Sequence, residues 1–188
     1  MKNAAILHGT DFEKTRTQSK NNWFPWLKKE LKDQGYQVWL PELPDADRPN
    51  VCTYNIFLDD NYDFDDETIM IGHSSGSTSI LGWLNKIPEN RKIKTAILVA
   101  GFKDNLGISE CDGLFTYDFD WNKLKKMADE YILIYSDDDP YVPLEHGKYF
   151  KEKLGDKAEL IIIKGQKHFS IGSFGEKYRQ FPELLKYL

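Results

Sequence analysis

The sequence predicts an α/β fold with a mostly parallel central sheet flanked by helices. Short apolar runs rich in Ile, Val, Leu and Tyr alternate with longer stretches of helical periodicity, which is the pattern of repeated βαβ units. Most of these runs are apolar at consecutive positions, as expected of parallel strands that are buried on both faces. The 188 residues suffice for one substantial core and are too few for two ordinary domains. We therefore expect a single domain over residues 1–188.

Six apolar runs are the candidate strands, and helices are expected between them. The runs cover residues 4–7, 36–40, 68–71, 94–99, 131–135 and 160–163. Between the first two runs, Trp23, Leu27 and Leu31 recur at helical spacing before Gly35, which predicts an amphipathic helix with a C-terminal stop. Similar periodicity predicts further helices over residues 75–86, 121–129, 144–154 and 176–188.

Two segments fit this alternation poorly. Residues 59–67, DDNYDFDDE, are an acidic aromatic run that is typical of a solvated loop or a helix end. Residues 101–120 follow the carboxyl end of a predicted strand, where open α/β sheets bind ligands. Gly and Asp alternate there with aromatic residues: Phe102, Phe115, Tyr117 and Phe119. This segment is expected either to wall a pocket or to form an ordinary surface loop.

Composition and charge restrict the class of partner. A net charge of -5 argues against nucleic acid or an anionic membrane as the main partner, so a small neutral or cationic ligand fits better. Cys52 and Cys111 lie far apart and suggest no disulfide framework, and no apolar stretch approaches the roughly 20 residues of a membrane span. The N-terminal stretch MKNAAILHG has too few apolar residues to form the core of a signal peptide. A cytoplasmic location is therefore expected.

The most specific motif is Gly72-His73-Ser74-Ser75-Gly76, which has the pattern G-x-S-x-G between a predicted strand and a predicted helix. Such a turn holds the serine at strained backbone angles and leaves no room for side chains two residues before and after it. The Ser75 amide then lies at a helix N-terminus, where an unpaired N–H suits a developing oxyanion. A phosphate-binding turn is the alternative, although the P-loop Lys and the G-x-G-x-x-G spacing are missing from the motif.

A nucleophilic serine needs a base and an orienting acid, which follow it in the order Ser, Asp or Glu, His in folds with this turn. Residues 136–143, SDDDPYVP, come after a predicted strand and contain three neighbouring carboxylates: Asp137, Asp138 and Asp139. His168 comes after the last predicted strand. The residues themselves do not rank the three carboxylates, although Pro140 restricts the conformation of Asp139. The chain thus offers all three types of residue in the required order.

The other histidines are given non-catalytic roles. The sharp turn should aim His73 away from the neighbouring hydroxyl, so we expect it to pack or to form a hydrogen bond. His146 falls in a predicted surface helix and is expected to be incidental. The three carboxylates could ligate a hard cation, but no spacing of further His or Cys ligands supports a metal site, and none is assigned.

These motifs together resemble a known family. Four segments are similar to the small serine-hydrolase family of the retinoblastoma-binding protein nine type. They are the serine turn at 72–76, here called the elbow, the Asp-Asp-Pro at 138–140, the His-Phe at 168–169 and the segment WFPWLKKELKDQGYQV near the start. The resemblance covers nearly the whole chain. It implies a compact α/β-hydrolase fold without a large lid domain, and a triad of three residues: Ser74 as nucleophile, Asp139 as acid and His168 as base.

The resemblance also suggests where an oxyanion would be held. In hydrolases of this type the loop after a His-Gly pair, here His8-Gly9, supplies an oxyanion amide, which would be that of Thr10. This amide would act beside that of Ser75. Many relatives are richer in glycine at this loop than the present chain.

The expected function is a cofactor-independent serine hydrolase that cleaves a small ester, thioester or amide. His168 would remove the Ser74 proton, Ser74 would attack the carbonyl, and water would hydrolyse the acyl-enzyme. Its expected partner is a small-molecule acyl substrate. The alternative is a catalytically weak protein of the same fold that serves as a protein-interaction module.

Overall fold

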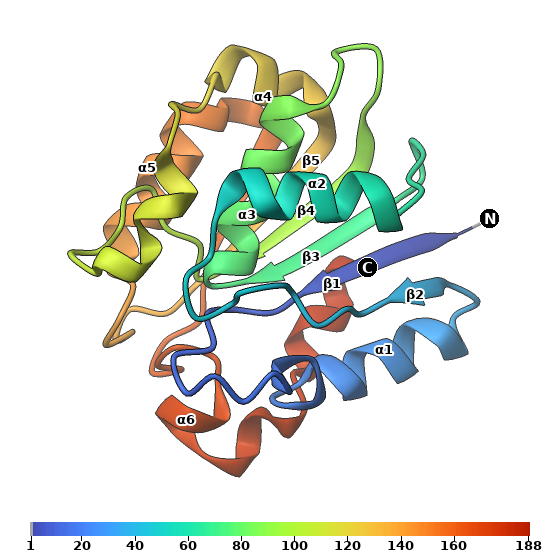
Figure 1. Ribbon diagram of the computed structural model, residues 1–188. Coiled ribbons are helices and arrows are strands. Elements are labelled where there is room, and N and C mark those ends of the chain that lie inside the picture. Colours follow the sequence, from blue (N-terminus) through green and yellow to red (C-terminus); the bar gives the residue numbers. More distant parts are fainter. Residues whose placement is uncertain (1) are drawn as a thin grey trace.

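A six-stranded sheet forms the centre of the computed structural model, which describes residues 2–188 (Figure 1). The strand order is β2-β1-β3-β4-β5-β6, and every neighbouring pair is parallel. All six predicted strands are confirmed, with their ends moved by a few residues. Their bounds are β1 (Asn3–Leu7), β2 (Gln37–Trp39), β3 (Ile69–His73), β4 (Ile93–Val99), β5 (Ala128–Tyr135) and β6 (Ala158–Ile162).

Helices cover both faces of the sheet (Figure 1). One face carries α2 (Val51–Asn61), α3 (Ser75–Lys86), α4 (Trp121–Met127) and α5 (Leu144–Leu154). The other face carries α1 (Phe24–Asp33), α6 (Ile171–Phe174) and the C-terminal 3-10 segments. Within residues 2–188, no helix combines the length and the apolarity needed to cross a membrane.

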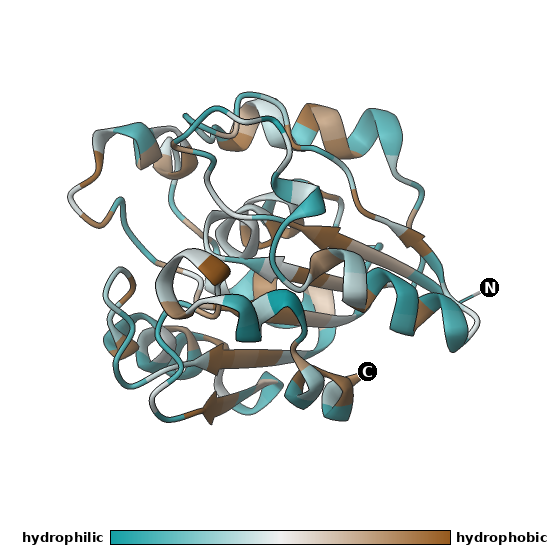
Figure 2. Cartoon of the chain, turned by 90° about the horizontal axis from the view of Figure 1, so that it is seen from below, coloured by the Kyte–Doolittle hydropathy of each residue, from teal (hydrophilic) through white to brown (hydrophobic). Residues whose placement is uncertain are grey.

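The sheet separates two hydrophobic cores, which explains the consecutive apolar positions in the strands. In β4, Ala96 and Leu98 join the core under α3, while Ile97 and Val99 join the core under α1. Figure 2 shows the strands mostly brown among helices and loops that carry much teal. Burial on both sides stabilises a strand only when neither face is polar, so the run becomes apolar throughout.

The first predicted helix is confirmed as α1. Leu27 and Leu31 are fully buried beside Phe24, Pro25 lies in the first turn, and Gly35 follows the helix with a φ of 87°. Proline suits a helix start because its missing N–H would have no partner there, and glycine suits the left-handed turn that ends the helix. The loop before this helix lines one side of a cavity described below.

The C-terminal helix predicted over residues 176–188 is wrong. The chain instead forms the short α6, followed by 3-10 segments at Glu176–Arg179 and Pro182–Tyr187. Gly175, with a φ of 97°, separates α6 from the first of these segments, and Gln180 is extended before Pro182, which cannot donate to a preceding turn. The predicted range is therefore divided into two short pieces. The helix predicted over residues 121–129 ends at Met127 because Ala128 already pairs with β4.

The sequence prediction missed α2. Its cap is visible in the sequence, since the Asn50 side chain accepts hydrogen bonds from the amides of Cys52 and Thr53. The acidic run 59–67 holds the end of this helix and the following loop, as expected. Two of its aromatic residues, Tyr62 and Phe64, are nevertheless buried, so the run is not simply solvated.

Candidate active site

The site lies at the carboxyl edge of the sheet, where the loops after the strands converge. Ser74 follows β3, Asp139 follows β5 and His168 follows β6. Ser74, His168 and Thr10 line one cavity of about 520 Å³. The fold thus brings the predicted nucleophile, the predicted base and one predicted oxyanion residue to a common space of the size that binds small molecules.

The turn at Ser74 has the strained geometry that the motif predicts. Its φ of 55° and ψ of -124° are rare for a residue with a side chain. A Cβ on Gly72 would lie 2.5 Å from the Ser77 nitrogen, and one on Gly76 would lie 2.4 Å from the Leu7 oxygen. Both contacts are with backbone atoms that cannot move aside. The expected requirement for glycine at these two positions is confirmed.

Backbone hydrogen bonds fix this turn against the sheet and the helix. The Ser74 amide donates to the Val99 carbonyl oxygen at 2.8 Å, which ties the turn to β4. Ser75 is the first residue of α3, so its N–H has no acceptor within the helix. The helix dipole adds positive potential at this end. The Ser75 amide is therefore suited to hold an oxyanion beside Ser74.

Asp139 is the carboxylate that contacts His168. Its Oδ2 lies 2.7 Å from Nδ1 of the imidazole, and the aspartate side chain is 1% exposed. Its Oδ1 accepts hydrogen bonds from the amides of Tyr141 at 2.8 Å and Val142 at 3.0 Å. A neutral imidazole that donates Nδ1–H to this carboxylate keeps Nε2 free to accept a proton. Among the described residues, no hydrogen bond joins this imidazole to the Ser74 hydroxyl, although both groups line the same cavity.

The two carboxylates next to Asp139 have other partners. Asp137 accepts a hydrogen bond from the Gly165 amide at 2.9 Å. Asp138 accepts one from the Lys167 amide at 2.9 Å and pairs with its ammonium at 2.8 Å. The hydrogen bond from the Lys167 side chain is the main reason that the pKa of Asp138 is lowered to about 2. These two residues hold the acid loop against the histidine loop, and only Asp139 reaches the imidazole.

His73 forms the hydrogen bond that was expected of it. Its Nε2–H donates to the carbonyl oxygen of His168 at 2.8 Å. Burial, with a further contribution from the neighbouring His168, lowers the pKa of His73 to about 3. The ring therefore stays neutral at ordinary pH, and it positions the backbone from which the imidazole of His168 projects.

His8 orients the loop that was predicted to hold the second oxyanion amide. Its Nε2 accepts a hydrogen bond from the Leu43 amide at 2.9 Å, so Nδ1 carries the hydrogen and donates to the Gly9 oxygen at 2.7 Å. Burial lowers the pKa of His8, which keeps this tautomer neutral. The peptide group is planar, so fixing the Gly9 oxygen also fixes the Thr10 N–H on the opposite side.

The two predicted oxyanion residues also contact each other. The Thr10 hydroxyl donates to the Ser75 hydroxyl at 3.0 Å, across 65 positions of sequence. A Cβ on Gly9 would lie 3.0 Å from the Cβ of Ser74, so this loop lies directly against the elbow. The loop and the N-terminus of α3 are therefore held in a fixed relation around the serine.

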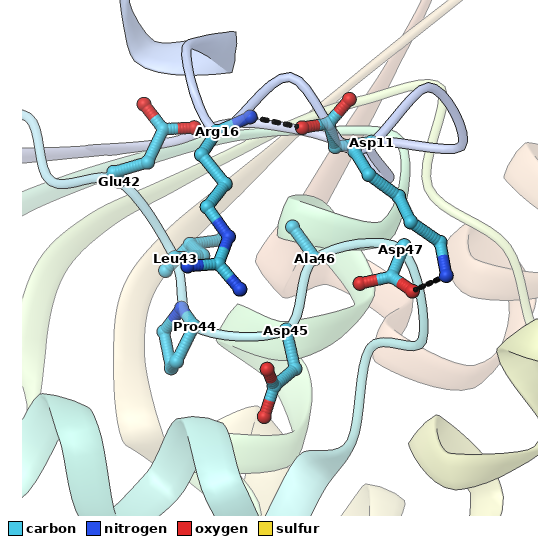
Figure 3. Close-up of a pocket in the computed structure, with 9 residues that line it drawn as sticks. Asp11, Arg16, Glu42, Leu43, Pro44, Asp45, Ala46 and Asp47 are labelled. Carbon is cyan, nitrogen blue, oxygen red and sulfur yellow. Dashed lines mark hydrogen bonds and ion pairs between the residues drawn. The ribbon is translucent and has the colours of Figure 1, made fainter.

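Asp11 is an organising residue that the sequence analysis missed. It is 2% exposed, and its carboxylate accepts a hydrogen bond from the Arg16 amide at 2.7 Å (Figure 3). It accepts another from Gln18 Nε2 at 3.0 Å. Burial raises the pKa of Asp11, but these hydrogen bonds and those from Thr15 outweigh it and the net pKa is lowered. The ionised carboxylate fixes the loop that follows Thr10. The signal was an acidic residue directly after the His-Gly-Thr segment.

A second cavity of about 520 Å³ lies beside this loop, between residues 11–16 and 42–47 (Figure 3). It is lined by charged residues of both signs, and Asp47 pairs with Lys14 at 3.1 Å. Glu42 turns toward the neighbouring loop, where it accepts a hydrogen bond from the Ser19 hydroxyl at 2.7 Å. The charges of this cavity are thus used largely to join the two loops.

His146 does not lie on the surface, so that expectation is wrong. It is 6% exposed, and its Nδ1 accepts a hydrogen bond from the Lys103 amide at 3.1 Å. Burial lowers its pKa, so it remains a neutral acceptor. The side chain ties α5 to the loop after β4 and so supports the cavity wall from behind.

The segment 101–120 walls two different depressions. Four of its residues line the cavity at the serine: Phe102, Leu106, Ile108 and Cys111. Other residues of the segment, among them Phe115, Tyr117 and Phe119, line a separate depression with Trp121 and Tyr149. The pocket-wall alternative is therefore confirmed. In the described part of the chain, His, Cys, Asp and Glu side chains form no group of three or more that could hold a metal ion.

Three features together define the class of α/β-hydrolases. They are a parallel sheet covered on both faces, a strained serine turn after β3, and an Asp–His pair in the loops after the last two strands. The model of the serine hydrolase family matches residues 6–188, and the chain belongs to this family.

Named relatives agree with this assignment. Serine hydrolase RBBP9 of Rattus norvegicus is 26% identical over 168 residues, which cover 88% of this chain and 87% of the relative. The putative hydrolase YdeN of Bacillus subtilis (strain 168) is 29% identical over 173 residues, which cover 89% of this chain and 86% of that protein. The crystal structure of the ydeN gene product from B. subtilis superimposes with a TM-score of 0.84 at 26% identity, covering 100% of this chain and 96% of that one.

Proposed function

We propose that the protein hydrolyses a small ester, thioester or amide through an acyl-enzyme on Ser74. One observation carries the proposal: the imidazole of His168 is held at 2.7 Å by the buried carboxylate of Asp139 and lines the same cavity as the strained serine. The Asp139 carboxylate is held in place by two backbone amides and lies against Nδ1, which is the position from which it can orient the imidazole and stabilise an imidazolium.

The first half of the reaction forms the acyl-enzyme. Nε2 of His168 takes the proton of the Ser74 hydroxyl as its oxygen attacks the carbonyl carbon. The carbonyl oxygen becomes an oxyanion that accepts hydrogen bonds from the Ser75 and Thr10 amides. The imidazolium then gives its proton to the leaving oxygen, sulfur or nitrogen, whose bond to carbon breaks.

The second half releases the acid. Nε2 of His168 takes a proton from water, the resulting hydroxide oxygen attacks the acyl carbon, and the proton passes to the Ser74 oxygen as the ester bond to the enzyme breaks. Asp139 holds the imidazole in one tautomer and stabilises its cation in both halves. Every proton and charge in this cycle is carried by the protein, the substrate or water, so the proposal requires no cofactor.

Trapping the acyl-enzyme tests this proposal. 4-Nitrophenyl acetate is mixed with the protein, quenched in acid at successive times and analysed by intact mass and peptide mapping. We expect one acetyl group on Ser74 that forms at the rate of the nitrophenolate burst and then disappears, and we expect none in Ser74→Ala. A folded protein that gains no acetyl group and releases no nitrophenolate above the buffer rate would instead favour the interaction-module alternative.

A further inference from the structure

The cavity at Ser74 has two chemically different walls, which come from opposite faces of the sheet. One wall is apolar and packs against the core under α3; it comprises Phe102, Leu106, Ile108 and Cys111. The other wall belongs to the α1 side and is mostly polar. Its polar side chains are Gln18, Asn21, Asn22, Ser170 and Arg179, and the apolar Phe12 and Ile171 lie among them. Ser74 lies between them at the end of the central strand β3.

The apolar wall is fixed to the helix that begins at the serine. Phe102 is 1% exposed, its amide donates to the Thr78 hydroxyl at 3.1 Å, and its carbonyl accepts from that hydroxyl at 2.9 Å. Thr78 lies in the first turn of α3. Leu106 and Ile108 are half-buried and line the cavity beyond Phe102. A substrate group that packs against these side chains would contact apolar surface and almost no hydrogen-bonding group.

The polar wall shares its support with His168. The Asn22 side chain accepts a hydrogen bond from the Ile171 amide at 2.7 Å, which joins the loop before α1 to the start of α6. The Trp23 indole donates to the Phe169 oxygen at 3.0 Å in the core on the same side. The loop that carries the imidazole and the polar wall are therefore one connected unit.

The reaction itself assigns one wall to each half of the substrate. In the tetrahedral intermediate the carbon is bonded to the Ser74 oxygen, the oxyanion, the leaving group and the acyl chain. The oxyanion must face the amides, and the leaving atom must lie within hydrogen-bond reach of His168 Nε2 to receive its proton. The leaving group thus extends along the histidine side of the cavity, where the Tyr141 ring packs against the imidazole and most of the other side chains are polar. The remaining direction, toward the apolar wall, is left for the acyl chain.

We propose that the substrate joins an unsubstituted apolar acyl group to a polar leaving group, and that Leu106 and Ile108 select the acyl chain. This inference rests on the proposed function. A carbonyl compound of the reverse design, with a polar acyl group and an apolar leaving group, would place polar atoms against Leu106 and Ile108 without hydrogen-bond partners.

A chain-length series tests the acyl wall with a constant leaving group. For 4-nitrophenyl esters from acetate to octanoate we expect kcat/KM to rise about fourfold for each methylene that the wall covers. Ile108→Trp should reduce the octanoate-to-acetate ratio of kcat/KM by about tenfold or more, because it fills the wall. Ile56→Trp is the matched control, since Ile56 is 59% exposed on α2 and should leave the ratio unchanged.

The reciprocal substitution keeps this test decisive if the tryptophan variant does not fold. Ile108→Ala enlarges the cavity and should move the preferred chain to a longer ester. A ratio that responds to neither change at Ile108, or that responds equally to Ile56→Trp, would overturn the assignment of this wall.

A matched pair of esters tests the polar wall. Propyl butyrate and 2,3-dihydroxypropyl butyrate share the acyl group and differ only in two hydroxyls on the leaving group. We expect kcat/KM to be about tenfold higher for the dihydroxypropyl ester, as two hydrogen bonds to the polar wall would provide. Equal rates, or a preference for the propyl ester, would contradict the assignment.

Failure of this inference can be told apart from failure of the proposed function. If acetate never appears on Ser74, the proposed function is wrong and the substrate classes lose their basis. If the acyl-enzyme forms on Ser74 but both selectivity tests give flat responses, the hydrolase mechanism stands and only the assignment of the walls is wrong.

Discussion

Asp139→Asn is expected to abolish nearly all activity while leaving the fold intact. In the structure the Asp139 Oδ1 accepts two amide hydrogen bonds, from Tyr141 and Val142, and Oδ2 faces Nδ1 of His168 at 2.7 Å. The asparagine oxygen is the only side-chain atom that could still accept from the two amides. Its NH₂ group must then face the imidazole, and two donors cannot share a hydrogen bond.

The expected magnitude follows from the tautomer that this orientation selects. An amide NH₂ toward Nδ1 stabilises the imidazole with its hydrogen on Nε2, which can no longer accept the Ser74 proton. The same change in a serine protease lowers kcat by about 10⁴, which corresponds to about 5 kcal/mol in activation free energy. The neutral isostere keeps both amide contacts, so Tm should change little.

Steady-state kinetics with 4-nitrophenyl butyrate, together with thermal unfolding, measure both expectations. Asp137→Asn and Asp138→Asn are the matched controls, because their carboxylates contact Gly165 and Lys167 rather than the imidazole. An Asp139→Asn protein that keeps kcat within tenfold of the wild type would refute the reasoning. A crippled Asp138→Asn beside an active Asp139→Asn would reassign the acid by one residue.

Three further predictions concern the surrounding structure. Gly76→Ala should lower the free energy of unfolding in urea by about 3 kcal/mol or more, because its Cβ would meet the backbone oxygens of Leu7 and His8. Gly172→Ala is the control and should be neutral, since its Cβ would have no atom within 4 Å. Thr10→Val should lower kcat about fivefold at unchanged KM, because it removes the hydrogen bond from the Thr10 hydroxyl to the Ser75 hydroxyl. Thr10→Ser should restore kcat. A change in KM alone would argue that Thr10 does not position the site. His73 has a folded pKa of about 3, below the unfolded value, so the unfolded chain binds the extra proton as the pH falls. Between about pH 6.5 and pH 3 this side chain should therefore lower the free energy of unfolding by about 1.4 kcal/mol per pH unit. A His73→Gln protein whose stability has the same pH slope as the wild type would contradict this.

The strand pattern and the elbow could be predicted because each leaves a local signal. The part of a strand that is buried on both faces is apolar at consecutive positions, as 96–99 is, whichever strands become its neighbours. Gly72 is required by the backbone of Ser77 in the same turn, and Gly76 is required by the carbonyl oxygens of Leu7 and His8. Both requirements are nevertheless visible in the sequence as the spacing of two glycines around the serine.

The acid could not be ranked from the residues because its partner is distant in sequence. Asp137, Asp138 and Asp139 are chemically identical, and only the packing of the loop after β6 against the loop after β5 decides which one meets His168. The family resemblance pointed to Asp139, and the contact with the imidazole agrees with it. Long-range contacts of this kind leave no periodic trace in the sequence.

Other features were missed or wrong for the same physical reason. His146 lies on a helix whose pattern predicts a surface position, but its ring accepts a hydrogen bond from a loop 43 positions away. In the sequence nothing distinguishes Asp11 from a surface carboxylate, because its hydrogen bond from the Arg16 amide forms only when the loop folds. The predicted C-terminal helix does not form because the chain is extended at Gln180, just before Pro182, in spite of the helical periodicity.

Labelling with a fluorophosphonate tests most directly whether Ser74 is a base-activated nucleophile. The wild-type protein and Ser74→Ala are incubated with the probe, and the adduct is located by intact mass and peptide mapping. We expect one adduct on Ser74, none in Ser74→Ala, and strongly slowed labelling in Asp139→Asn. An adduct on Ser75 or Ser77, or undiminished labelling of Ser74→Ala, would contradict the assignment of Ser74 as the nucleophile.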